Sequence, residues 1–116
     1  MAQFMLTIMY DPSQPPDSIP SRQKLHAALG EEMRAKGQYL GGAGLAPVEM
    51  YAKRVMEQGE DSPILDGPFA ETREALGGYF MVECSEEEAL DWARRIAHDP
   101  RSWIEVRRMW MDPHGA

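Results

Sequence analysis

Two short segments with apolar residues on both of their faces constrain the fold of this chain most strongly. Residues 4–10 and 79–84 are rich in β-forming side chains, and Asp11 and Pro12 end the first segment. Side chains of a strand alternate between the two faces of a sheet. In the first segment Phe4, Leu6, Ile8 and Tyr10 alternate with Met5, Thr7 and Met9, and in the second Tyr79 and Met81 alternate with Phe80, Val82 and Cys84. If helices cover one face of such a sheet, the other face needs a further partner, and the simplest partner is a second copy of the chain.

Two helices are predicted between these strands and after them. A proline-rich loop over residues 12–20 precedes a helix that starts at Ser21 and stops at Gly37, and its apolar stripe recurs every four residues at Leu25, Leu29 and Met33. The second helix opens with a capping box, in which the Ser85 hydroxyl accepts from a first-turn amide while Glu88 reaches back, and Pro100 marks its end. Its apolar face consists of Ala89, Trp92, Ala93 and Ile96.

Further strands are predicted over residues 39–46, 48–57 and 104–110, with a short extended piece over residues 63–65. The order is β-α-β-β-(β)-β-α-β. Two helices on one face of a largely antiparallel sheet form an α+β, ferredoxin-like sandwich. We expect one domain over residues 1–112, followed by a tail at residues 113–116.

Composition excludes several classes of protein. A formal charge of −7 argues against a nucleic-acid partner, because phosphate contacts need clustered Lys and Arg. The single cysteine, Cys84, excludes an internal disulfide framework and is expected to be a buried small apolar residue. No stretch approaches the length of a membrane span, and the N-terminus lacks a signal-peptide profile. We therefore expect a cytoplasmic protein without a membrane partner.

The segment DGPFAETRE, residues 66–74, carries the strongest candidate for chemistry. Asp66 follows a short strand at a turn, and a carboxylate shielded there by Phe69 can have a raised pKa and act as a general acid or base. The alternative is turn chemistry alone, with Asp66 accepting backbone amides and Gly67 at positive φ. Phe69 and Arg73 are candidates for binding a substrate, an anionic one in the case of Arg73, although a solvated turn is the commoner explanation of Arg73.

Other candidates lie elsewhere in the chain. His26 sits at the edge of the apolar stripe of the first helix, where it can face solvent or a cleft. Gly42 belongs to a glycine-rich strand, which indicates close backbone packing or a ligand lying against the strand. Tyr10 can supply a hydroxyl group to a cleft. The carboxylates near residue 71 have no His at ligand spacing, so neither a metal nor another cofactor is expected.

The chain resembles the YCII-related, or DGPF-domain, family of small bacterial proteins. The resemblance rests on FMLTIMY, EEMRAKG, GGAGLAP, DGPFAETRE-x-LGG, ALDWARRI and IEVR, in that order. It implies a ferredoxin-like fold of the dimeric α/β-barrel group, in which two sheets pack face to face in a homodimer. Relatives in the broader group are proposed enzymes with a His–Asp pair in a cleft, and His26 lies near the place of that His.

Three functions remain open. The first is a small-molecule enzyme in which Asp66, together with His26, moves a proton on an unidentified ligand. The second is a non-catalytic ligand-binding or regulatory module, because some family members are encoded beside extracytoplasmic-function sigma factors or fused to them. In the third, DGPFAETRE is purely structural and pins the short strand and the dimer edge.

Overall fold

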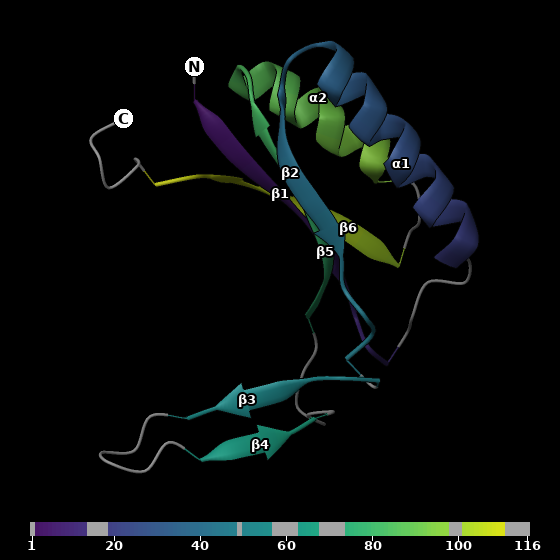
Figure 1. Ribbon diagram of the computed structural model, residues 1–116, viewed down its shortest axis with the longest axis vertical. Helices are drawn as coiled ribbons and strands as arrows, with labels where there is room; N and C mark the ends of the chain where they lie inside the picture. Colours follow the sequence, from purple (N-terminus) through teal and green to yellow (C-terminus); the bar gives the residue numbers. More distant parts are fainter. Residues whose placement is uncertain are drawn as a thin grey trace.

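The main body of the described structure is a four-stranded antiparallel sheet with two helices on one face (Figure 1). A computed structural model describes residues 2–13, 19–48, 50–56, 63–67, 74–97 and 101–110. The sheet has the order β2–β5–β1–β6, and the helices are α1 (Ile19–Ala35) and α2 (Glu86–Ile96). Its strands are β1 (Gln3–Tyr10), β2 (Tyr39–Gly44), β5 (Ala75–Glu83) and β6 (Ser102–Arg108). The predicted ferredoxin-like α+β fold is confirmed, because β1-α1-β2 and β5-α2-β6 form its two split β-α-β halves.

The core lies between the helices and the face of the sheet toward which every second strand residue points. Leu6 of β1 and Val82 of β5 are fully buried there, as is Met33 of α1. The four residues predicted for the apolar face of α2, Ala89, Trp92, Ala93 and Ile96, are all buried. The capping box of Ser85 and Glu88 is present, and Gly37 ends α1 with a φ of +69°. The helix faces and caps read from the sequence are therefore confirmed.

The opposite face of the sheet carries the second set of alternating residues. Met5, Thr7 and Met9 of β1 and Tyr79 and Met81 of β5 are half-buried, and α1 and α2 both lie on the other side (Figure 1). Trp103 of β6 pairs with Met9 and extends the same surface. We call this surface the open face of the sheet.

The segment predicted as a long third strand is different in the structure. Of its described residues, Lys53–Val55 alone form a strand, β3, and it pairs with β4 (Ile64–Asp66) in a separate two-stranded sheet rather than in the main one. A turn precedes it, in which the amides of Met50 and Tyr51 both donate to the carbonyl of Pro47. The prediction over residues 48–57 was too long because this proline-led turn occupies its first half.

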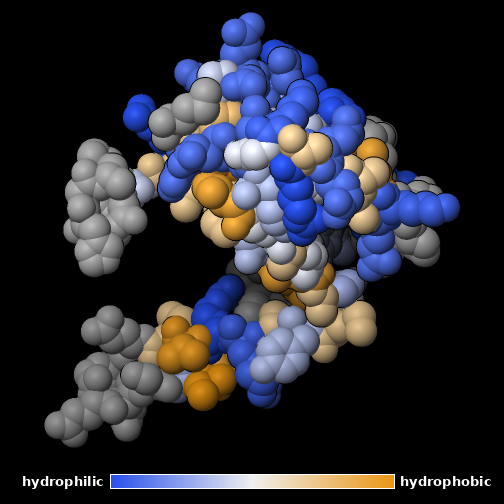
Figure 2. Space-filling model, turned by 45° about the horizontal axis from the view of Figure 1, so that its top comes forward, coloured by the Kyte–Doolittle hydropathy of each residue, from blue (hydrophilic) through white to orange (hydrophobic). Residues whose placement is uncertain are grey.

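The β3–β4 hairpin extends away from the body of the molecule (Figure 1). Its large apolar residues are exposed, and Figure 2 shows apolar side chains gathered there. They are Tyr51, Val55, Met56, Ile64 and Leu65.

Other element boundaries moved by a few residues. The strand predicted from residue 79 begins at Ala75, the helix predicted from Ser21 begins at Ile19, and the last strand covers Ser102–Arg108. The second helix ends at Ile96, before the predicted Pro100, which lies outside the described residues together with the tail at 113–116. None of the helices in the described ranges is long and apolar enough to cross a membrane.

Candidate functional site

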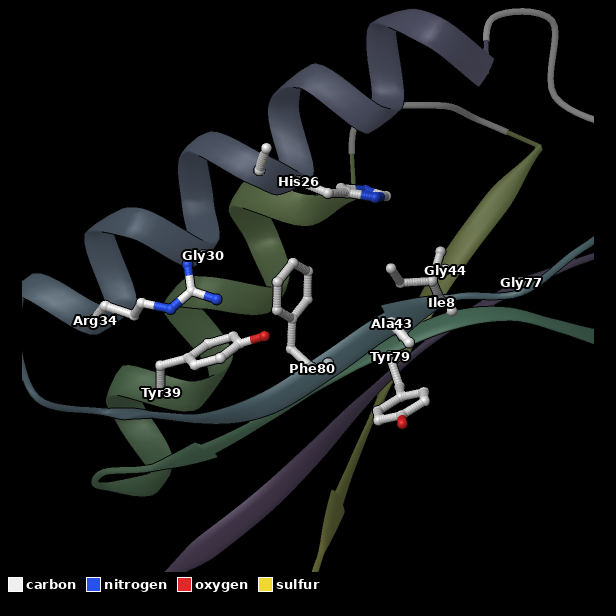
Figure 3. Close-up of a pocket in the computed structure, with 13 residues that line it drawn as sticks. Ile8, His26, Gly30, Arg34, Tyr39, Ala43, Gly44, Gly77, Tyr79 and Phe80 are labelled. Carbon is white, nitrogen blue, oxygen red and sulfur yellow. The ribbon is translucent and has the colours of Figure 1, made fainter.

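A cleft of about 200 Å³ lies between α1 and the edge of the sheet formed by β2 and β5 (Figure 3). His26, Gly30 and Arg34 of α1 line one side of it. These residues are four apart, so the helical repeat places them one above another on the same face of α1. Residues of β2 and β5 line the opposite side. The volume is below the roughly 300–1,000 Å³ typical of pockets for drug-sized ligands, so a ligand here would be small.

His26 brings an imidazole to one end of the cleft. The ring meets Phe80 edge-on, with ring centroids 5.9 Å apart and an interplanar angle of 88°. Its Nε2 atom is buried. Histidine ordinarily exchanges a proton near neutral pH, so this is the group of the cleft best suited to acid–base chemistry.

Arg34 lies two helical turns further along α1, at the other end of the row that His26 begins (Figure 3). Its guanidinium carbon is 4.2 Å from the centre of the Tyr39 ring, and its Nη1 donates to Glu31 Oε1 at 2.6 Å. A guanidinium group has five N–H donors, so the bond to Glu31 leaves others for a ligand. The stacking on Tyr39 holds the group over the cleft.

The floor of the cleft is mostly backbone, because glycines of β2 and β5 meet there. A Cβ atom on Gly42 would lie 2.7 Å from the carbonyl oxygen of Tyr79, and one on Gly78 would lie 3.0 Å from the carbonyl oxygen of Ala43. The glycine-rich stretch therefore allows close approach of the two strands, as the sequence indicated. Gly42 also lines the cleft.

The two residues predicted to act together, Asp66 and His26, do not meet in the structure. Asp66 ends β4, where its side chain is 78% exposed and its Oδ1 lies 3.0 Å from Lys53 Nζ. It is absent from the described residues that line the cleft with His26.

Of the other predicted site residues, Tyr10 is described by the structure, whereas Phe69 and Arg73 lie outside the described residues. Tyr10 is buried, its hydroxyl accepts a hydrogen bond from the Val48 amide at 3.3 Å, and it is likewise absent from the described lining of the cleft. Tyr10 therefore fixes the segment after β2.

Gly30, Arg34 and Tyr39 were not among the predicted site residues. The sequence does carry a signal for the first two, since residues 26, 30 and 34 share one helix face. Tyr39 was one of four tyrosines that no pattern distinguished. Only the packing of the start of β2 beneath α1 brings its ring under Arg34.

A second polar cluster, at the start of β2, ties that strand to α2. Trp92 Nε1 donates to Gln38 Oε1 at 2.8 Å, and Gln38 Nε2 donates to Glu88 Oε2 at 2.8 Å. Hydrogen bonds from the Ser85 backbone, from Gln38 and from the Ser85 hydroxyl lower the pKa of Glu88. Each polar group here is used in capping or in tethering, so we assign the cluster to stability.

Cys84 lies beneath this region and is fully buried. Burial raises the pKa of its thiol, and the nearby charge of Glu88 raises it further. The residue therefore behaves as the small apolar side chain that the sequence predicted. In the described part of the chain, no group of three or more His, Cys, Asp or Glu side chains is arranged to hold a metal ion.

Comparison with known proteins gives two matches. The family model of the YCII-related domain matches residues 2–110. An uncharacterized protein of Rhizobium meliloti (strain 1021) is 47% identical over 36 residues, which make up 30% of this chain and 29% of that protein. This second match therefore covers less than a third of the relative's length.

Proposed function

The chain belongs to the YCII-related family, and from this premise we propose that it is an enzyme that moves a proton on a small organic ligand. The observation that carries the proposal is the position of His26, which lines the cleft and contacts Phe80 edge-on. A titratable group in a concave site with a few convergent polar groups is the usual starting point for an acid–base mechanism.

The proposed reaction is proton abstraction from a carbon next to a carbonyl group. Neutral His26 takes the C–H proton and becomes an imidazolium, while the electron pair moves onto the carbonyl oxygen as an enolate. We assign the stabilisation of that oxygen to Arg34 and the hydroxyl of Tyr39, which line the same cleft as His26. The imidazolium then returns the proton to the ligand, which restores the enzyme.

Asp66 enters this scheme only through a second copy of the chain. We propose a homodimer in which the open faces of two sheets pack together, since those faces carry half-buried Met5, Met9 and Met81 and both described helices lie on the opposite side. The β3–β4 hairpin of one protomer would then lie near its partner, and Asp66 with it. Sedimentation equilibrium at micromolar concentration tests the dimer, and a Met81→Glu variant should dissociate it. A wild-type chain that sediments as a monomer contradicts this arrangement.

Hydrogen–deuterium exchange into small keto acids tests the proton transfer on simple model ligands. Levulinate and 2-oxobutyrate each combine an acidic C–H beside a carbonyl with a carboxylate, and NMR in D₂O follows the loss of that proton. We expect exchange above the buffer rate with wild-type protein, and exchange at the buffer rate with His26→Gln. Equal exchange by wild type and His26→Gln contradicts the role of His26, and no exchange above buffer with either acid contradicts the proposed reaction.

The exposed apolar hairpin favours a second candidate function. Tyr51, Val55 and Ile64 are each more than 60% exposed, and such clusters commonly mark protein-binding surfaces. In this alternative the chain is a non-catalytic regulatory module that contacts a protein such as an extracytoplasmic-function sigma factor. Co-purification of a sigma factor by wild type but not by a Val55→Asp, Ile64→Asp variant, which must remain folded by circular dichroism, supports it. Equal recovery with both proteins, or none with either, contradicts it.

A further inference from the structure

Helix α1 carries a glycine in its interior that the backbone does not require. Gly30 lies eleven residues after Ile19 and five before Ala35, and it is buried. The one glycine with positive φ in the described residues is Gly37, so Gly30 has an ordinary helical conformation that alanine also adopts. Glycine is the least favourable residue in a helix interior after proline, whereas alanine is the most favourable. The helix is therefore less stable with glycine at this position than with alanine.

Packing does not require the glycine either. A Cβ atom on Gly30 would lie 3.8 Å from Phe80 Cε1, 3.9 Å from Tyr39 Cε1 and 4.0 Å from Arg34 Nη1, which are ordinary van der Waals distances. Gly42 is the useful contrast, because a Cβ there would meet a backbone oxygen at 2.7 Å. Alanine at position 30 would fit and would add contacts to two aromatic rings.

All three atoms nearest to that Cβ position belong to residues that line the cleft. The space left open by Gly30 is therefore part of the cleft itself, between the ring edges of Phe80 and Tyr39 (Figure 3). Ring edges favour contact with the face of another flat, unsaturated group. The planar guanidinium of Arg34 borders the same space through Nη1, which also donates to Glu31, and its other N–H groups suit a carboxylate.

We infer that Gly30 is a specificity-determining residue: its missing side chain admits the flat ring of a small carboxylate, which binds between Phe80 and Tyr39 with its acidic group at Arg34. This inference rests on the proposed function, because it names the class of ligand for the same cleft. A volume of about 200 Å³ limits that ligand to about one ring with short substituents.

Sodium benzoate is a suitable probe, and benzamide is its neutral counterpart of the same shape. Titration followed by the ring resonances of His26 and Phe80 should show saturable binding of benzoate to wild-type protein and weaker binding of benzamide. Gly30→Ala should raise the melting temperature by about 2–5 °C and raise the dissociation constant for benzoate by about fivefold or more. In Arg34→Gln, the affinities for benzoate and benzamide should become nearly equal.

Ala28→Gly is the matched control, since Ala28 is an exposed residue of the same helix. It should lower the melting temperature and leave benzoate affinity unchanged. A lower melting temperature in Gly30→Ala overturns the inference, because the glycine is then structurally required. Unchanged benzoate affinity in Gly30→Ala, or no saturable binding to wild type, also overturns it.

The outcome is separable from that of the proposed function. If benzoate binds as expected but neither keto acid exchanges its proton above the buffer rate, the inference about Gly30 stands and the proposed proton-transfer reaction is refuted. If proton exchange depends on His26 but Gly30→Ala and wild type bind benzoate with equal affinity, the proposed reaction is supported and the role of Gly30 is refuted.

Discussion

Gly42→Ala should destabilise the protein through one close backbone contact. The new Cβ would lie 2.7 Å from the carbonyl oxygen of Tyr79 and 3.3 Å from Phe80 Cδ1. Carbon–oxygen contacts in sheets normally begin at roughly 3.3 Å, so β2 and β5 must move apart. Neither atom is the end of a long flexible side chain, and the carbonyl belongs to a strand paired with β2 at Gly42 and Ala43.

The position of β2 in the sheet limits how much stability Gly42→Ala should lose. Adding a methyl group to a packed site typically costs about 1–3 kcal/mol. Strand β2 is at the edge of the sheet, so it can lift away from β5 without disturbing another strand, which favours the lower part of that range. Alanine also lowers the conformational entropy of the unfolded chain, which stabilises the folded state by about 0.4–1 kcal/mol and offsets part of that loss. We expect a net loss of about 1 kcal/mol and a melting temperature lower by roughly 4 °C.

Gly44→Ala is the matched control, because Gly44 lies on the same strand and a Cβ there has no atom within 4 Å. It should be neutral or stabilise by up to about 1 kcal/mol. Urea unfolding at one fixed protein concentration, followed by circular dichroism and tryptophan fluorescence, measures both variants. If Gly42→Ala unfolds at the same urea concentration as Gly44→Ala, the close approach of β2 and β5 does not hold, and the reasoning is refuted.

Three further outcomes are expected. Because its pKa is lowered in the fold, Glu88 stabilises the protein above the ordinary carboxyl pKa of 4.5, and the contribution is lost as pH falls through the lower folded-state value. The melting temperatures of wild type and Glu88→Gln should therefore differ at pH 7 and converge on acidification; a gap that persists at pH 2 contradicts this. Cys84 should react with a thiol reagent such as DTNB at once in urea but only slowly in native protein, since burial raises its pKa; rapid native labelling is the contrary result. Asp66→Asn should change the free energy of unfolding by less than about 1 kcal/mol, because the ion pair with Lys53 is exposed; a loss above about 2 kcal/mol would instead favour the structural function of DGPFAETRE.

The helices could be predicted closely because their signals are local. The capping box of Ser85 and Glu88 and the four-residue repeat of Leu29 and Met33 depend on residues within one or two turns of each other. Strand limits were less accurate. The start of β5 was missed because glycines at 77 and 78 resemble a turn, yet here they allow close packing against Tyr10 and Ala43.

The candidate site was predicted in part. His26 was placed at the edge of the apolar stripe, and the structure puts it in the cleft. Asp66 was recognised as a residue that a turn presents, but turn chemistry does not say where a hairpin points. The hairpin carries Asp66 away from the cleft, and Asp66 forms an ion pair with Lys53 of β3.

The sequence by itself determined the fold class, the buried faces of the helices, the caps and the two-sided strands of this protein. Each of these follows from apolar residues that recur every two residues in a strand or about every four in a helix, or from capping side chains within one helical turn. The tertiary structure alone decided which side chains meet. Arg34 and Tyr39, or Gly30 and Phe80, come together because α1 crosses the β2–β5 edge at one angle and one register. That register depends on the packing of the whole core, and no short-range pattern contains it.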